Sequence, residues 1–436
     1  MSTIQRATKR FGFRYAYALA AAALLVTMLV SGAMAQSIIH AVDGAHGQQY
    51  VDHVSEMARK FSTETGIQVN VMTASGHREQ IAVWAAGGAL PDAIDIVSDN
   101  GLGFFRQGLF MDLTQFFDRG SQRLDDLIPI AVEAFTAPEN LEVQPGAVFA
   151  FPSFLHNYNA GYNVPIFENA GLVFPSELGE AWNWETLRDY ARKLTIDRNS
   201  DGRIDQWGLF IPKSYLGWGP LFRHAGNPIF DRDVDPTAAF LNTEAAIETV
   251  EFLAEMTEGQ YFVWENWQFS EGRTGLSYAF ASNTAQLMAD RHLTVDYAPY
   301  AYGPGGVNGS EFQVAATAIS STTEHADLVW QRLTFLWGDP SNTEGMINAT
   351  KRIPAQISGL TLFNDLASDW APNIHVVAAS AGLPGSGLRP IVRDSRILGT
   401  ISNWVHQAID GQVPAFSALT TAQEQVDAIF RELAAN

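Results

Sequence analysis

The clearest pattern of apolar and polar positions in this chain lies between Trp182 and Phe210. Apolar residues recur at the three- and four-residue spacing of an amphipathic helix, with charged residues between them. The apolar set is Trp184, Leu187, Tyr190, Ala191 and Leu194. A cluster of Asp, Asn and Gly follows and favours a tight turn, and 207–210 is typical of a short buried strand. The segment is therefore predicted to be one helix–turn–strand unit.

Strand-like and helix-like patterns also alternate, with short connections, after residue 36. Strands are predicted at 37–42, 67–72 and 91–97, and helices at 48–65 and 78–86. Gly66 directly follows the first of these helices, at the position where glycine most often ends a helix. This strand–helix rhythm predicts an α/β fold with a mainly parallel sheet.

The first 35 residues have the pattern of an export signal. Four basic residues precede an apolar run from Ala16 to Val30, and Ala33-Met34-Ala35 then offers a cleavage site before Gln36. The alternative is a membrane anchor, but a run of about 15 residues is short for a bilayer, which needs about 20. The mature protein is therefore predicted to begin near Gln36 and to be released into a bacterial periplasm.

Length, cysteine content and charge narrow the class of protein further. The chain has 436 residues, no Cys and a formal net charge of −20. A mature chain of about 400 residues exceeds what one hydrophobic core usually covers, so two domains are expected. The absence of Cys excludes disulfides, thiol nucleophiles and Cys-ligated metals. The acidic balance argues against nucleic acid or an anionic membrane surface as a partner.

Several motifs, in order, resemble one family. The start of the mature chain resembles the opening of the extracellular solute-binding proteins of ABC importers, in the group of maltose- and multiple-sugar-binding proteins. The segments that carry this resemblance are FSTETGIQVNVM, AAGGALPDAIDIVSDN and RQGLFMDLTQFF. The segment GAVFAFPSFLHNYNAGYNVPIFENAGL resembles the family's first crossing between lobes. Further along the chain, YGPGG and KRIPA at 351–355 resemble later elements of the family. A family strand resembles EGRTGLSYAF, although Leu276-Ser277 replaces the usual Ala-Met. Together, and in this order, the motifs span nearly the whole mature chain.

The resemblance implies a two-lobed periplasmic binding protein fold, with mixed, mainly parallel sheets and a hinged cleft between the lobes. In open α/β sheets, ligands sit beyond the carboxyl ends of the strands, and hinged lobes close on them. The chain would cross between the lobes near 151–154, 312–315 and 353–357. The N-terminal lobe would then comprise 36–152 plus 314–355, and the C-terminal lobe 153–313 plus 356–436.

It also implies the substrate-binding protein of an ABC importer, a monomer that binds a mono- or oligosaccharide and delivers it to permease subunits. Such a protein needs no cofactor and is not an enzyme, and the sequence holds no G-x-S-x-G, H-E-x-x-H or P-loop motif. Two alternatives stay open. One is a binder of a polyol, glycerol-phosphate or other small solute, because Arg291 and Arg352 could hold a phosphate. The other is an exported carbohydrate-active hydrolase with a carboxylate pair.

Candidate ligand-binding residues lie in loops that follow predicted strands or adjoin the crossings. The polar candidates are His46, Gln49, His77, Asp99, Asn100, His156, Asn283 and Arg352. Aromatic rings stack on the apolar faces of sugars while planar polar groups take the hydroxyls. The aromatic candidates are Trp218, in a Gly-flanked loop where the family commonly places a stacking aromatic, Trp267 and Tyr302. Core packing is the alternative for each ring.

The turn after the 184–194 helix carries the first half of a calcium loop. Oxygen ligands at positions 1, 3 and 5 and a glycine at position 6 are in place; the four candidate ligands are Asp197, Asn199, Asp201 and Asp205. Position 12 is Gly208 instead of the usual Glu, and a strand follows where a helix is expected. These residues either form only a turn or hold a structural calcium ion.

Overall fold

The computed structural model describes residues 36–74, 76–264 and 267–435, so the predicted leader at 1–35 lies outside it. The strands are β1 Ser37–Asp43, β2 Gln68–Ala74, β3 Ala93–Val97, β4 Phe151–Asn163, β5 Trp207–Phe210, β6 Phe262–Val263, β7 Thr274–Ala281, β8 Val295–Ala298, β9 Glu311–Ile319, β10 Ile353–Pro354 and β11 Gly387–Leu388. The predicted strands at 37–42, 67–72, 91–97 and 207–210 are confirmed to within two residues.

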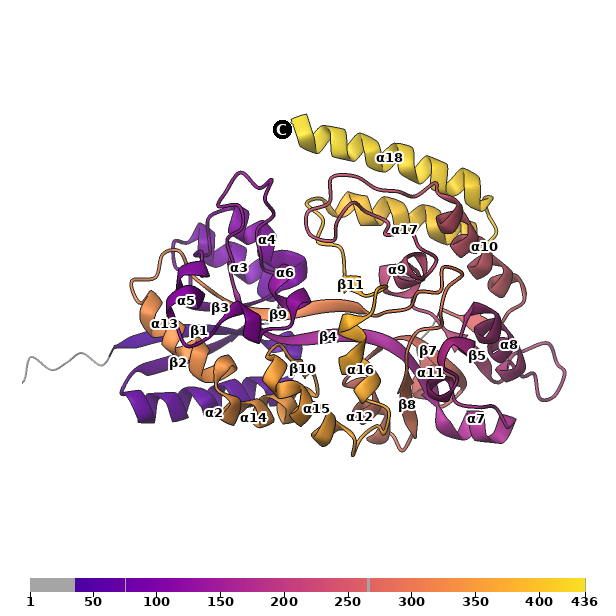
Figure 1. The fold of residues 1–436 in the computed structure, drawn as a ribbon, viewed down its shortest axis with the longest axis horizontal. Coiled ribbons are helices and arrows are strands. Elements are labelled where there is room, and N and C mark those ends of the chain that lie inside the picture. The colour runs from indigo at the N-terminus through magenta and orange to yellow at the C-terminus, as the bar shows by residue number, and fades with distance from the viewer. Residues whose placement is uncertain (1–35, 75, 265–266, 436) are drawn as a thin grey trace, which may run out of the picture.

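Helices surround these strands (Figure 1). Those of the first half of the chain are α2 Gln48–Thr65, α3 His77–Ala86, α4 Ser98–Arg106, α5 Thr114–Arg119, α6 Pro129–Glu133, α7 Val164–Ala170, α8 Trp184–Leu194 and α9 Tyr215–His224. Those of the second half are α10 Glu244–Glu258, α11 Trp267–Ser270, α12 Thr284–Ala289, α13 Ala326–Leu333, α14 Pro340–Thr350, α15 Leu360–Ala367, α16 His375–Ala379, α17 Ser395–Ile409 and α18 Ala415–Ala435. The helix predicted at 184–194 is confirmed, and its predicted apolar face is buried.

One sheet runs through the described part of the molecule in the order β2-β1-β3-β9-β4-β7-β5-β6. Its two ends are parallel: β1 pairs with β2 and β3, and β5 pairs with β6 and β7. The long strand β4 joins them, because its first half pairs antiparallel with β9 and its second half with β7 and β8. Figure 1 shows β4 crossing the middle of the molecule. We call the part around β1–β3 the first lobe and the part around β5–β8 the second lobe.

The predicted crossings lie next to one another in this central region. Residues 151–154 open β4, 312–315 lie in β9, and Ile353 and Pro354 of β10 pair antiparallel with Leu155 and Phe154 of β4. Because β9 is antiparallel to both β3 and β4, strands β1–β3 run in the direction of β4, whereas β5 and β7 run against it. The carboxyl ends of both sets of strands therefore face the junction between the lobes.

Two apolar clusters form the core. The first gathers β1, β3, β9 and the start of β4 with α2, α4 and α5, and the second gathers β5 and β7 with α8, α9, α10, α17 and α18. Phe363, Ala367 and Val377 of α15 and α16 pack in the first cluster, although the sequence division assigns 356–436 to the second lobe. The division into lobes by residue number stays a prediction.

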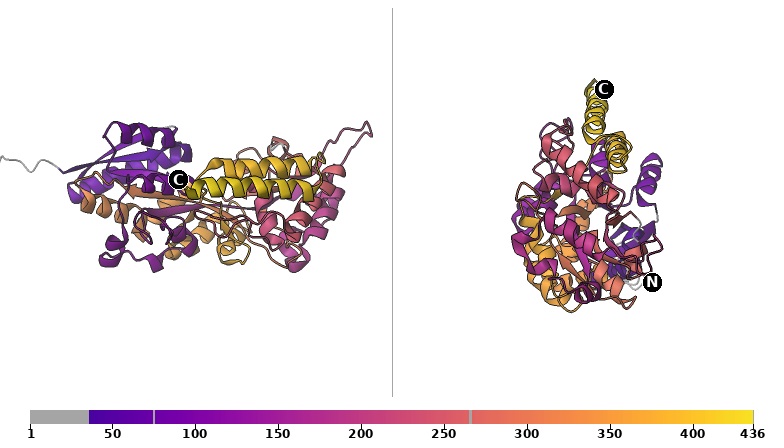
Figure 2. Two further views of the ribbon diagram at one scale, coloured as in Figure 1. Left: turned by 90° about the horizontal axis from the view of Figure 1, so that it is seen from above. Right: turned by 90° about the vertical axis from the view of Figure 1, so that its right-hand side faces the viewer.

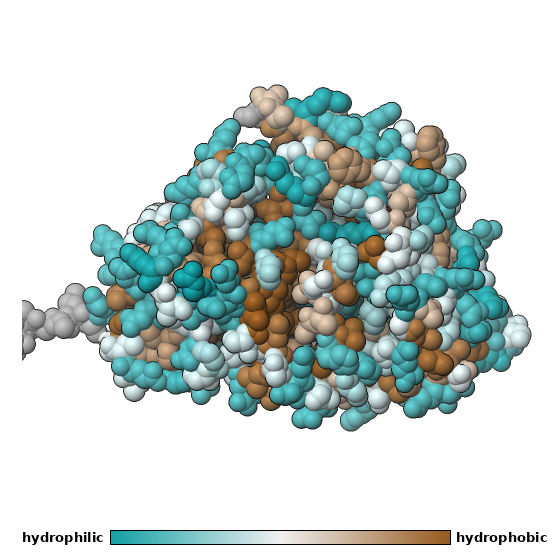
Figure 3. Space-filling model, in the orientation of Figure 1, coloured by the Kyte–Doolittle hydropathy of each residue, from teal (hydrophilic) through white to brown (hydrophobic). Residues whose placement is uncertain are grey.

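The last two helices form the outer layer of the second lobe. α17 and α18 lie side by side, as the views in Figure 2 show, and both pack against α10. The face drawn in Figure 3 carries apolar surface in a hollow at its middle, over the region where Figure 1 shows β4 and β9. Among the described residues, none of the helices combines the length and the apolar character that crossing a membrane requires.

Candidate functional site

Two cavities open at the junction where the strand ends converge. The larger, of about 850 Å³, lies between α2 of the first lobe, α12 of the second lobe and the end of α14; we call it the α2 cavity. The smaller, of about 280 Å³, lies between α4 and residues 391–393; we call it the α4 cavity. Each is lined by segments far apart in the sequence, as expected for a site that two lobes build together.

The α2 cavity is lined mainly by polar side chains. The first lobe supplies His46 and Gln49, α12 and the residue before it supply Asn283 and Gln286, and the chain entering β10 supplies Lys351. Side-chain amides carry both donors and acceptors in one plane, which suits them to hydroxyl groups. The cavity can therefore hold a polyhydroxylated molecule in contact with both lobes.

The helices that begin at this junction from the first lobe lack side-chain caps. The N-cap residues of α2, α3 and α4 are Gly47, Gly76 and Val97, and none makes a side-chain capping bond. Gly47 has φ 99°, which a residue with a Cβ rarely adopts. The first-turn N–H groups of α2, beside the cavity, are thus available to a bound molecule.

A cluster of histidine and arginine lies beside the α2 cavity. The guanidinium of Arg352 contacts the imidazole of His156 through Nη1 and Nε2, 2.5 Å apart. The ring of His46 lies 5.4 Å from that of His156 and 5.0 Å from that of Phe154. Burial, followed by the charge of Arg352, lowers the pKa of His46 to about 4. His46 is therefore neutral at physiological pH and can both donate and accept a hydrogen bond.

Asp95 holds this wall of the cavity in place. Its carboxylate accepts hydrogen bonds from Tyr50 at 2.8 Å, Thr317 at 2.8 Å and His40 at 3.0 Å, and from the backbone N–H of Asp43 at 3.2 Å. Burial opposes ionisation, but the contacts with His40 and Tyr50 prevail and lower the pKa of Asp95 to about 2. Asp95 is not among the candidates predicted from the sequence, although an acidic residue within the apolar strand AIDIV was a signal for it.

Ion pairs join the lobes at the α4 cavity. Arg106 of α4 lies 3.0 Å from Asp235 of the second lobe, and Arg393 binds the same carboxylate through two nitrogens at 2.6 and 2.7 Å. Asp235 has no exposed surface. Beside them, Asp99 pairs with Arg389 at 3.1 Å. This side of the junction is held closed by direct contacts within the protein.

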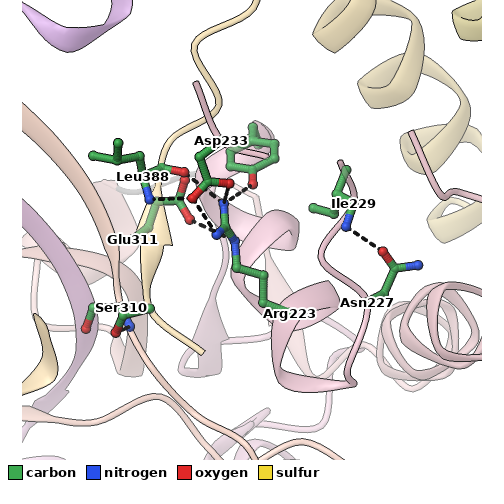
Figure 4. A network of polar contacts seen from close by, with 9 residues as sticks. Arg223, Asn227, Ile229, Asp233, Ser310, Glu311 and Leu388 are labelled. Atoms are coloured by element: carbon green, nitrogen blue, oxygen red, sulfur yellow. Dashed lines mark hydrogen bonds and ion pairs between the residues drawn. The ribbon is translucent and has the colours of Figure 1, made fainter. Parts of the chain in front are cut away.

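A buried polar network continues from this contact into the second lobe (Figure 4). Arg223 donates to both carboxylate oxygens of Asp233, at 2.9 and 3.0 Å, and to the carbonyl of Leu388 at 2.8 Å. Glu311 lies 3.8 Å from the Nε of Arg223, beyond hydrogen-bond distance. Burial raises the pKa of Glu311 to about 8 despite the nearby Arg223.

The structure brings most of the polar candidates to the junction. His46, Gln49 and Asn283 line the α2 cavity, with His156 and Arg352 next to them, and Asp99 and Asn100 line the α4 cavity. His77 is only 6% exposed, and neither of its ring nitrogens has a hydrogen-bond partner. Its ring lies against Trp84 at 5.9 Å.

The aromatic candidate Trp218, unlike most of the polar candidates, does not lie at the junction between the lobes. The expectation that Trp218 lies in a loop, open to a sugar, is wrong: it belongs to α9, has no exposed surface and packs against Tyr215 and Phe222. Its flanking glycines are packing positions, because a Cβ at Gly217 would lie 2.2 Å from the carbonyl of Pro212, and one at Gly219 would lie 2.5 Å from the Tyr215 ring.

The other two aromatic candidates are Tyr302 and Trp267. The backbone of Tyr302 bridges to Asn183 before α8, and Tyr302 lines neither cavity. Trp267 opens the short helix α11 instead of a loop, and its side chain lies outside the described part of the structure.

The candidate calcium turn is closed by its own hydrogen bonds. Asp197 accepts from the N–H of Gly202 at 2.8 Å, Asp205 accepts from the N–H of Arg198 at 2.8 Å, and Asn199 donates its amide to Asp201 at 3.1 Å. One carboxylate oxygen of Asp197 is buried without a partner. Within the described ranges, no three His, Cys, Asp or Glu side chains are grouped closely enough to hold a metal ion. In this arrangement the four candidates do not form a calcium cage.

Comparisons with known proteins identify the family and the fold. Residues 48–342 match the family described as bacterial extracellular solute-binding protein. No curated protein matches the chain. An ABC substrate-binding protein from Listeria monocytogenes, in complex with cycloalternan, is 18% identical, with a TM-score of 0.74 over 90% of this chain and 98% of that one.

Two further solved structures share the fold over nearly their whole length. The cyclic alpha-maltosyl-1,6-maltose binding protein from Arthrobacter globiformis is 15% identical, with a TM-score of 0.76 over 92% of this chain and 100% of that one. The maltose/maltodextrin-binding domain from Bdellovibrio bacteriovorus, bound to maltotriose, is 18% identical, with a TM-score of 0.68 over 91% and 100%. At these identities the likeness shows the fold, which is that of two-lobed binding proteins.

Proposed function

The chain belongs to the bacterial extracellular solute-binding protein family, and on that premise we propose that it binds a carbohydrate between its lobes and delivers it to the permease of an ABC importer. The observation that carries this proposal is the α2 cavity, about 850 Å³ in volume and lined by Gln49 of the first lobe and Asn283 and Gln286 of the second. That volume lies within the usual range of small-molecule sites. Of the solved relatives described above, one is in complex with cycloalternan and another is bound to maltotriose.

The mechanism is a shift between an open and a closed form. A solute that contacts both lobes stabilises the closed form in proportion to its preferential affinity for that form. The crossings in β4, β9 and β10 lie together at the centre of the sheet, where a small change in backbone angles can reorient one lobe against the other. The closed, loaded protein then docks on the permease, and the protein itself performs no covalent chemistry.

We also propose that the protein acts outside the cytoplasmic membrane, after removal of residues 1–35, and as a monomer. The basic leader, apolar run and Ala33-Met34-Ala35 support export. Intact-mass measurement of exported protein tests this step, and a mass that retains the leader in a membrane fraction would contradict it.

The experiment for binding uses the mature chain and a panel of saccharides, polyols and phosphorylated solutes. At least one carbohydrate should raise the melting temperature and bind with Kd near micromolar, roughly −8 kcal/mol. Small-angle scattering should show a smaller radius of gyration with that ligand, and chromatography should recover the sugar intact. No shift for any carbohydrate, or steady conversion of the sugar into products, would refute the proposal.

A further inference from the structure

Arg352 carries a charge that the protein does not neutralise. No carboxylate among the described residues lies within ion-pair distance of its guanidinium, whereas Arg106, Arg223, Arg389 and Arg393 at the same junction all have carboxylate partners. Arg352 contacts the ring of His156, and its Nε is buried without a hydrogen-bond partner. A half-buried cation in this state is costly unless an anion reaches it.

The same wall of the α2 cavity offers further donors. Lys351 lines the cavity next to Arg352, and His46 of the same lobe lines it as well. The uncapped start of α2, an 18-residue helix, adds free backbone N–H groups and the positive end of the helix dipole. Arg332 is also without a carboxylate, but it is wholly enclosed and donates to the carbonyl of Val54, so it cannot reach a solute.

The acidic residues nearby are engaged or lie at the rim. Asp95 is held by His40, Tyr50 and Thr317, and Asp43 accepts from the N–H of Ala45. The carboxylates that line the α2 cavity, those of Asp52, Glu56 and Asp290, belong to exposed residues. The charge around the cavity therefore changes from acidic at the rim to basic at Lys351, which lines it, and at Arg352 beside it.

We propose that the solute of the α2 cavity is an acidic carbohydrate, whose carboxylate or phosphate group pairs with Arg352 while its hydroxyls meet Gln49, Asn283 and Gln286. The planar guanidinium fork matches either anion through two parallel hydrogen bonds. Neutral rings of the solute extend toward the rim, where its acidic group would be repelled by Asp52 and Asp290. This inference rests on the proposed function, because it names the class of carbohydrate that the same cleft takes.

The test measures Kd by calorimetry for three sets of solutes on the mature chain: neutral maltooligosaccharides, uronic-acid oligosaccharides and sugar phosphates. An acidic set should bind more tightly than the neutral set and should weaken as salt is raised. Arg352→Gln should lose roughly tenfold to hundredfold in affinity for that set, as expected for a lost hydrogen bond to a charged group. Whether uronates or phosphates respond identifies the anion.

Two variants control for misfolding and for general charge. Arg352→Lys keeps the charge without the fork and should retain part of the preference, whereas Arg59→Gln, on an exposed position of the same helix α2, should leave every Kd unchanged. Neutral sugars that bind as tightly as acidic ones, or an Arg352→Gln variant that keeps the acidic preference, would overturn this inference and leave the carbohydrate proposal standing. Absence of binding by all three sets would overturn both.

Discussion

The α2 and α4 cavities lie at one junction but use charged side chains in opposite ways. At the α4 cavity, Asp235 is shared by Arg106 and Arg393, and Asp99 pairs with Arg389. At the α2 cavity, Lys351 and Arg352 have no carboxylate partner among the described residues. The first arrangement holds two lobes together without a solute, and the second leaves donors for one.

The difference shows which contacts can make closure of a hinged binding protein depend on its solute. A contact made in the absence of solute stabilises the closed form equally with and without it, so it contributes nothing to selectivity. Groups left unpaired are satisfied only when the solute is present, so their interaction energy favours the loaded, closed form. The α4 contact therefore sets how closed the empty protein is, and the α2 cavity sets what it recognises.

The largest expected effect comes from breaking the α4 contact. Asp235→Asn keeps the side-chain shape and tolerates the positive φ of 55°, but it leaves Arg106 and Arg393 without their carboxylate. We expect the free energy of unfolding to fall by about 3 kcal/mol, the scale for removing one partner from a buried ion pair. Chemical denaturation measures this loss.

An exposed pair provides the control. Arg119 and Asp327 also lie 3.0 Å apart, but their side chains are 57% and 86% exposed. Asp327→Asn should therefore change stability by less than about 1 kcal/mol. Equal effects of the two substitutions would show that Asp235 does not hold the lobes together.

A smaller effect should separate the two cavities by solute affinity. Asn348 lines the α2 cavity and Gln107 lines the α4 cavity, and both are exposed residues at a cavity edge. Asn348→Trp should weaken carbohydrate binding at least tenfold, about 1.4 kcal/mol, because the indole occupies space that the solute needs. Gln107→Trp should leave Kd nearly unchanged. Calorimetry decides between them, and the reverse result would move the solute to the α4 cavity.

The pH dependence of stability tests whether Glu311, in the buried network next to the α4 cavity, is protonated in the folded protein. Burial raises the pKa of Glu311 to about 8 from an ordinary value of 4.5, so between these pH values the folded state holds a proton that the unfolded state has lost. Stability should therefore fall as pH rises from about 5 to 8, by at most about 1.4 kcal/mol per pH unit from this group. Glu311→Gln should flatten the melting temperature across that window. The exposed Glu324→Gln should leave the slope as in the original chain, and an unchanged slope in Glu311→Gln would contradict the assignment.

The sequence predicted elements from local patterns and missed what depends on distant partners. Helix α8 was predictable because its apolar residues share one face. The polar candidates reached the junction because strand ends converge there. The pairing of Arg106 with Asp235, 129 residues apart, and of His156 with Arg352, 196 residues apart, has no local signal. Trp218 was misplaced because glycine beside an aromatic residue permits close helix packing as readily as a loop.

The smallest expected effect concerns the turn at 197–205, which lines neither cavity. Its carboxylates already accept backbone N–H groups of Gly202, Arg203 and Arg198, and the Asn199 amide donates toward Asp201, so a calcium ion would have to displace bonds that the turn makes by itself. We expect a chelator to leave the melting temperature unchanged. A fall of several degrees, restored by calcium and absent in Asp197→Asn, would instead identify the buried, unpartnered oxygen of Asp197 as a metal ligand.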